Sequence, residues 1–128
     1  MAKIVLITGG ARSGKSAFAE KFARQAGPRV AYIATAEVGD GEMAERVALH
    51  RRRRPAEWQT YEAPMQAETA IAAIAAAGQA NLILFDCLTV YTSNALLAQP
   101  EDAPVPLRRE AVLAALDRLL AAAGRFSG

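Results

Sequence analysis

The chain has 128 residues, of which 52% are hydrophobic, so it can fill the core of one domain and has little room for two. Its 15 lysines and arginines against 13 acidic residues give a net charge of +2, which argues against a strongly basic protein built to bind nucleic acid. A single cysteine excludes an internal disulfide, and no apolar run approaches the roughly 18 residues of a membrane span. With no signal-like leader, we expect one soluble, cytoplasmic domain over residues 1–128.

The first predicted elements are a strand over residues 3–8 and a helix over 14–26. Residues 3–8 are almost continuously apolar, which is typical of a central strand covered on both faces. The helix has apolar residues at helical spacing, and Gly27 and Pro28 end it. A second apolar strand is predicted over residues 29–34.

The middle of the chain predicts two helices separated by a short strand. A helix over residues 42–53 would be closed by Pro55, because a residue before proline is pushed out of helical dihedral angles. A short strand follows over residues 58–62. The second helix covers residues 64–78, with Pro64 in its first turn.

The last part of the chain predicts a strongly apolar strand over residues 81–86, a helix over 88–97, a proline-rich linker over 99–106 and an amphipathic helix over 107–123. Alternating strands and helices predict an α/β fold with a mostly parallel sheet and helices on both faces. In such folds ligands bind at the carboxyl ends of the strands.

A phosphate-binding loop is the clearest motif. Residues 9–16 read G-G-A-R-S-G-K-S and complete G-x-x-x-x-G-K-[ST] between a predicted strand and a predicted helix, so an ordinary glycine turn is the weaker alternative. Backbone N–H groups and the helix dipole would face the phosphates, Lys15 would reach the β and γ phosphates, and Ser16 would ligate Mg²⁺. The fold is therefore expected to be of the P-loop NTPase, RecA-like kind. The expected contacts are Gly9, Gly10, Ala11, Arg12, Ser13, Gly14, Lys15 and Ser16.

Asp86 ends an apolar strand, where phosphate-loop enzymes place an acid that helps to hold Mg²⁺. The plainer alternative is an aspartate of a strand-terminal turn. Its position at a strand end does not separate metal ligation from contact with a base. The neighbouring Cys87 is expected to be a small buried residue rather than a nucleophile.

His50 is the single histidine of the chain, and four arginines, residues 51–54, follow it. On the predicted helix His50 shares a stripe with Met43 and Val47, so its imidazole is expected to face the body of the protein. The arginines are either a solvated basic face or a clamp on a triphosphate. Beside such a clamp, a neutral imidazole is a good nucleophile toward phosphorus. The spacing leaves open whether His50 is a nucleophile or incidental.

Five ordered segments carry a more specific signal. They are the loop 9–16, the Tyr-Ile-Ala-Thr-Ala segment 32–36, the stretch 40–55 with Glu42-Met43-Ala44 leading to His50 and Arg54-Pro55, Trp58 with Glu62, and the segment 85–89 with Ser93 and Asn94. Together they resemble the bifunctional adenosylcobinamide kinase and adenosylcobinamide-phosphate guanylyltransferase family of cobalamin (vitamin B12) biosynthesis.

The resemblance implies two reactions. ATP or GTP phosphorylates the hydroxyl of the aminopropanol arm of adenosylcobinamide, and GTP then donates GMP to that phosphate, giving adenosylcobinamide-GDP and pyrophosphate. His50 would carry GMP as a covalent intermediate. Besides the loop, the implied GTP contacts are Ala34, Thr35, Ala36, Arg51, Arg52, Arg53, Arg54, Glu62 and Asp86, of which Glu62 rests wholly on the resemblance.

The loop motif and the strand end predict Mg²⁺ held by Ser16 and Asp86, and the small net charge predicts no nucleic-acid partner. The resemblance implies small-molecule substrates and a homo-oligomer, a trimer. Family members continue through further strands and a helix, so the chain would be truncated at its C-terminal side. We then expect an uncovered sheet edge and a bare apolar face on the helix 107–123.

Four alternatives stay open or are set aside on the residues. Another small-molecule kinase with the same loop would make His50 incidental, and a nucleotide-binding fragment would be inactive. A GTP-driven switch needs an Asn-Lys-x-Asp string, which the sequence lacks. Nucleic-acid binding would rest on one arginine run with few aromatic residues beside it.

Overall fold

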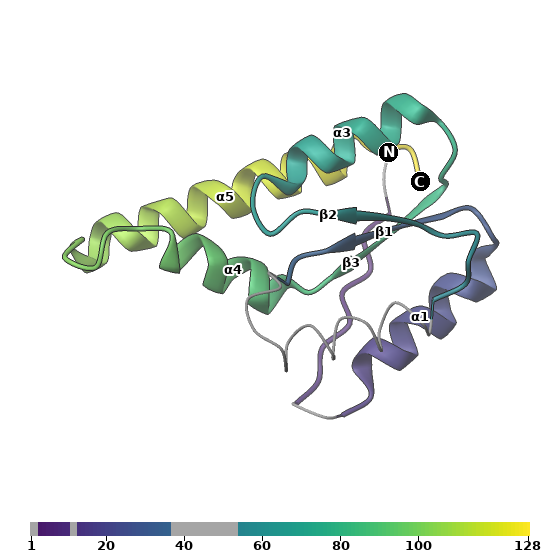
Figure 1. Ribbon diagram of the computed structural model, residues 1–128, viewed down its shortest axis with the longest axis horizontal. Helices are drawn as coiled ribbons and strands as arrows, with labels where there is room; N and C mark the ends of the chain where they lie inside the picture. Colours follow the sequence, from purple (N-terminus) through teal and green to yellow (C-terminus); the bar gives the residue numbers. More distant parts are fainter. Residues whose placement is uncertain (1–2, 11–12, 37–53) are drawn as a thin grey trace.

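A computed structural model describes residues 3–10, 13–36 and 54–128 of the chain. Figure 1 shows a small sheet with helices on both sides. The elements in chain order are α1 (Lys15–Ala26), β1 (Val30–Ala34), β2 (Gln59–Glu62), α3 (Ala67–Ala77), β3 (Leu82–Asp86), α4 (Leu88–Leu97) and α5 (Val105–Arg125). The predicted α/β class with a parallel sheet is thereby confirmed.

The sheet of the described residues has three parallel strands in the order β2-β1-β3. β1 lies in the middle, and its register sets Tyr32 level with Thr60 of β2 and Leu84 of β3. Level residues of parallel strands point to the same face of a sheet. The alternation along β1 therefore assigns each of its side chains to one of two cores.

Two apolar clusters lie on opposite faces of β1. Ile33, fully buried, packs with residues of α3, α4 and α5, whereas Tyr32 packs with Ala23 of α1 and with Trp58. In Figure 1, α1 lies below the sheet and α3 and α5 lie above it. Burying a side chain such as Ile33 contributes about 1.5–3 kcal/mol, so the larger cluster dominates the stability of the fold.

The ends of α3 use local chemistry that the sequence only partly signals. The helix is capped at its carboxyl end by Gly78, whose φ of 66° is left-handed and whose N–H donates to the carbonyl of Ile74 at 3.3 Å. Arg29 then donates from Nε to the carbonyl of Gln79 at 2.8 Å and from Nη2 to that of Gly78 at 3.0 Å. A cation at the carboxyl end of a helix also interacts favourably with the helix dipole. Arg29 therefore ties the start of β1 to the end of α3.

The strand predicted over residues 3–8 is wrong for this structure, because these residues pair with no strand. Ile4, Val5 and Leu6 are 61%, 49% and 73% exposed. An apolar run indicates a tendency to be buried, but a strand also requires a backbone partner. Here the segment shares an apolar cavity with β3 instead of a hydrogen-bond ladder.

Two predicted helix starts were misplaced. α3 begins at Ala67 and not in the turn of Pro64, because Gln66 adopts φ 56° and the buried N–H of Ala67 donates to the hydroxyl of Tyr91 at 3.0 Å. α5 begins at Val105, two residues before the predicted start, because Pro106 is tolerated in a first helical turn. The remaining boundaries of described elements lie within two residues of the predictions.

The predicted helix over residues 42–53 lies outside the described residues. Within the described part, β3 forms an edge of the sheet, and Leu113 and Leu120 of α5 are 52% and 57% exposed. The helices described are all too short or too polar to cross a membrane.

We predict that Ile74→Ala lowers the free energy of unfolding by about 2–5 kcal/mol, because it removes most of a side chain that is 1% exposed in the larger core. Urea denaturation followed by far-ultraviolet circular dichroism measures the change. Leu97→Ala is the matched control, since Leu97 is 77% exposed and its loss should cost less than about 0.5 kcal/mol. Equal losses in the two variants would contradict this core assignment.

Candidate nucleotide site

The described part of the phosphate loop lies directly before α1. The N–H of Ser13 and the Nζ of Lys15 both donate to the carbonyl of Gly10, at 3.2 Å and 3.4 Å. Gly14 has φ 83°, a left-handed conformation that a residue with a Cβ adopts at a cost of about 1–2 kcal/mol. The motif thus brings Lys15 and Ser16 to the amino end of a helix, where the dipole favours phosphate. Ala11 and Arg12 lie outside the described residues.

A cavity of about 540 Å³ joins the loop to β3. Its wall includes Lys15 and Ser16 from the start of α1 and Asp86 from the end of β3, and most of the rest is apolar. A triphosphate with its cation needs a lysine to contact the phosphates, and a hydroxyl and a carboxylate to hold the metal ion. These are the three groups found here. Sequence reasoning paired these three residues, and the structure places them around one space.

Asp86 also belongs to a row of level residues. The register sets Glu62 of β2, Ala34 of β1 and Asp86 of β3 side by side at the carboxyl ends of the three strands. All three point to the face of the sheet covered by α1, because Tyr61, Ile33 and Phe85 face the other core. Glu62, which only the family resemblance suggested, therefore shares one edge and one face with Asp86.

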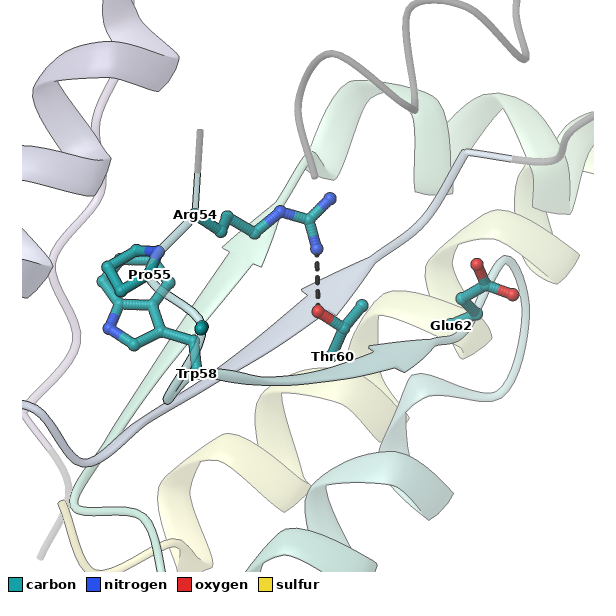
Figure 2. Close-up of a pocket in the computed structure, with 6 residues that line it drawn as sticks. Arg54, Pro55, Trp58, Thr60 and Glu62 are labelled. Carbon is teal, nitrogen blue, oxygen red and sulfur yellow. Dashed lines mark hydrogen bonds between the residues drawn. The ribbon is translucent and has the colours of Figure 1, made fainter. Parts of the chain in front are cut away.

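Arg54 lies over this same face. Its Nη1 donates to the hydroxyl of Thr60 at 2.9 Å, drawn as the dashed line in Figure 2, and its Cζ lies 3.7 Å from the centre of the Tyr32 ring. Arg54 and Glu62 line an open hollow of about 610 Å³ together with Pro55, Ala56, Trp58 and Thr60. A guanidinium at the mouth of a hollow is suited to phosphate oxygens.

Tyr32 connects the guanidinium to the carboxylate. Its hydroxyl donates to Oδ2 of Asp86, while its ring face supports Arg54. Burial raises the pKa of the Tyr32 phenol far above its ordinary value, and the adjacent Asp86 carboxylate raises it further. Tyr32 is therefore the protonated donor in this hydrogen bond.

Thr35 and Asn94 fix the chain at the carboxyl end of β1. The Oγ1 of Thr35 accepts the N–H of Cys87 at 2.9 Å, and the N–H of Thr35 donates to the carbonyl of Asp86 at 3.1 Å. Asn94 donates from Nδ2 to the carbonyls of Thr35, at 2.8 Å, and of Pro64, at 3.0 Å. The bonds of Thr35 fix the backbone that carries the carboxylate of Asp86, whereas Asn94 ties Thr35 to the segment that follows β2.

Cys87 has a structural position. It is half-buried, and its sulfur accepts the N–H of Val90 at 3.4 Å, so it caps the start of α4. This agrees with a packing role more than with a nucleophile, although the thiol is not fully buried.

The residues present are suited to a bound Mg²⁺. Ser16 and Asp86 line one cavity and offer a hydroxyl and a carboxylate, which are hard oxygen ligands of the kind that Mg²⁺ prefers. Over residues 3–10, 13–36 and 54–128 no cluster of three histidine, cysteine or acidic side chains is placed to hold a metal alone.

Several expected site residues are not placed. His50, Arg51, Arg52 and Arg53 lie outside the described residues, so their approach to the site stays a prediction. Tyr32 was missed as a site residue. It lies within the Tyr-Ile-Ala-Thr-Ala segment, but only the register shows that its side chain faces Arg54 and Asp86.

Comparison with known proteins agrees with these features. The sequence profile of the family described as "Cobinamide kinase / cobinamide phosphate guanyltransferase" matches residues 5–127. The chain is 49% identical over 116 residues to the bifunctional adenosylcobalamin biosynthesis protein CobP of Pseudomonas aeruginosa, covering 89% of this chain and 64% of that protein. It is 45% identical over 95 residues to the bifunctional adenosylcobalamin biosynthesis protein CobU of Salmonella typhimurium, covering 74% of this chain and 51% of that protein.

The same-named CobU protein of Escherichia coli is 34% identical over 127 residues, covering 95% of this chain and 68% of that protein. The chain therefore spans less than two thirds of the length of the first two relatives.

We predict that Thr35→Val lowers the free energy of unfolding by about 1–3 kcal/mol, because it leaves the N–H of Cys87 without its acceptor in a part-buried place. Chemical denaturation measures the loss. Thr92→Val is the control with the same change of atoms, since the hydroxyl of Thr92 makes an exposed bond to the carbonyl of Leu88 in its own helix, at 2.9 Å. A loss in Thr92→Val as large as in Thr35→Val would show that Thr35 has no special role.

Proposed function

The chain belongs to the cobinamide kinase / cobinamide phosphate guanyltransferase family, and on this basis we propose that it acts in both reactions of cobalamin biosynthesis. In the first, ATP or GTP phosphorylates adenosylcobinamide. In the second, GTP transfers GMP to the resulting phosphate through a histidine of the protein, giving adenosylcobinamide-GDP and pyrophosphate.

One observation carries the proposal. Lys15, Ser16 and Asp86 line a single cavity, although Asp86 is 70 positions farther along the chain than Ser16. Asp86 is also level with Ala34 and Glu62 across the sheet. The same edge therefore gathers residues from the phosphate loop and from three strands.

The kinase step is phosphoryl transfer to an alcohol. The alcohol oxygen of adenosylcobinamide forms a bond to the γ phosphorus, the bond to the β–γ bridging oxygen breaks, and the alcohol proton leaves to solvent or a base. Lys15 would offset the negative charge that grows on the β–γ bridge. Ser16 and Asp86 would hold Mg²⁺, which when bound neutralises charge on the phosphates.

The second step cleaves the triphosphate between α and β. A ring nitrogen of His50 forms a bond to the α phosphorus and pyrophosphate leaves. A phosphate oxygen of adenosylcobinamide phosphate then attacks the same phosphorus, and the bond to His50 breaks. A phosphorus–nitrogen bond suits this relay because it is reactive enough to pass its group on. Arg54 would contact phosphate, and Glu62 lies on the same face of the sheet.

The proposal includes the setting in which the enzyme works. Its partners would be small molecules, namely GTP, ATP and the corrinoid, and no nucleic acid. We place it in the cytoplasm as a homo-oligomer, a trimer by resemblance to the family.

We predict that GTP labelled at the α phosphate, with Mg²⁺, leaves acid-labile and alkali-stable label on the unaltered chain. His50→Ala should lose the label, because no other histidine exists in the sequence. The label is measured on denatured protein after gel separation.

Label retained by His50→Ala would overturn the histidine mechanism. No label on the unaltered chain would overturn guanylyl transfer and leave another kinase or an inactive nucleotide-binding fragment. GTP labelled at the γ phosphate is the matched control, since transfer of GMP leaves no γ phosphate on the protein.

A further inference from the structure

Tyr32 is a buried polar side chain on the face of the sheet that carries the candidate site. It lies in the middle of β1, is 2% exposed, and packs with Ala23 and Trp58. An apolar residue would satisfy this packing equally well. Packing alone does not explain a phenol at this position, because a buried hydroxyl costs free energy unless it forms a hydrogen bond.

The ring of Tyr32 meets a cation from a different part of the chain. The guanidinium carbon of Arg54 lies 3.7 Å from the ring centre, within the range of a cation–π contact. Thr60, level with Tyr32 on β2, accepts from Nη1 of the same guanidinium at 2.9 Å. Ring and hydroxyl together fix the plane of the Arg54 fork above the sheet, as Figure 2 shows for the Thr60 contact.

The hydroxyl of Tyr32 meets an anion. It donates to Oδ2 of Asp86, which lies two positions beyond the residue level with Tyr32 on β3. Carboxylates that bind metal commonly have such a hydrogen bond from a neighbouring side chain, which orients the remaining oxygen. Thr35 fixes the backbone of Asp86, and Tyr32 fixes its side chain.

We propose that Tyr32 is a positioning residue of the nucleotide site, holding Arg54 with its ring and Asp86 with its hydroxyl so that phosphate and cation are bound together. The inference rests on the proposed function in taking this face as the site of GTP. It adds that one buried side chain couples the anion-binding and cation-binding halves of that site.

The test separates the two contacts with a binding assay. The probe is the α,β-methylene analogue of GTP, which cannot transfer GMP to the protein. Its affinity is measured without metal, and Mn²⁺ binding to the complex is then followed by electron paramagnetic resonance. Tyr32→Phe keeps the ring and removes the hydroxyl. We expect its Mn²⁺ affinity to fall at least about tenfold. Its metal-free affinity for the analogue should stay within about twofold of the unaltered chain.

Tyr32→Met removes the ring as well and should weaken metal-free binding too, because Arg54 loses its support. Urea denaturation checks that each variant unfolds cooperatively. If Tyr32→Met does not fold, the Tyr32→Phe measurements decide between the outcomes. Tyr61→Phe is the matched control, since its hydroxyl bonds the exposed side chain of Gln59 and its ring faces the other core.

A double-mutant cycle distinguishes positioning from general damage. In an Asp86→Asn background, Tyr32→Phe should cost Mn²⁺ affinity less than about twofold, because the carboxylate that it positions is gone. Unchanged Mn²⁺ affinity in Tyr32→Phe alone, or losses that multiply in the double variant, would overturn the inference.

The binding assay and the labelling experiment fail independently. If the unaltered chain takes up label normally and Tyr32→Phe binds Mn²⁺ as tightly as the unaltered chain, only the role of Tyr32 is overturned. Absent label with the expected binding shifts would overturn only the proposed GMP transfer. An unaltered chain that does not bind the analogue would overturn both.

Discussion

The parallel pairing of β1 with β3 is the constraint on which the rest of the structure depends. It sets Ala34 level with Asp86, and the bonds of Thr35 to Asp86 and Cys87 extend the pairing beyond the ladder. A slip of one residue would turn Asp86 from the face of Arg54 and Tyr32 into the core of α3 and α5. An unpaired carboxylate in that core would cost several kcal/mol, so the apolar side chains of β3 enforce the register that the site needs.

The order of elements and the parallel sheet could be predicted because both follow from local patterns. Apolar runs, Gly27 with Pro28 and the alternation of strand with helix carry this information within a few residues. The strand expected over residues 3–8 could not be judged in this way. Composition measures what a segment gains from burial, whereas pairing depends on which backbone lies beside it. In the described structure Ile4 and Leu6 stay exposed beside an apolar cavity.

The residues of the candidate site also fall into those indicated by local sequence patterns and those that depend on strand pairing. Lys15 and Ser16 could be predicted as candidates because they belong to a sequence motif, and Asp86 because it ends an apolar strand. Glu62 had no signal of its own, since an exposed acid at the end of a short strand is common, and its relevance comes from its position level with Asp86 across the sheet. Tyr32 resembles any core aromatic residue of a strand until Arg54, 22 positions later in the chain, lies over its ring. Contacts between segments are set by register, which the sequence encodes only through the whole sheet.

The unpaired side of β3 affects how readily the backbone amides of the sheet exchange with solvent. Within the described residues, β1 is paired on both sides, whereas β3 is paired only with β1. In a parallel ladder successive amides point to alternate sides, so part of β3 has amide protons that no neighbouring strand shields. Their exchange with deuterium should be fast while those of β1 exchange only on larger openings. The carboxylate of Asp86 thus lies on the less protected strand. The backbone that carries it is held in place by its hydrogen bonds to β1 and to Thr35.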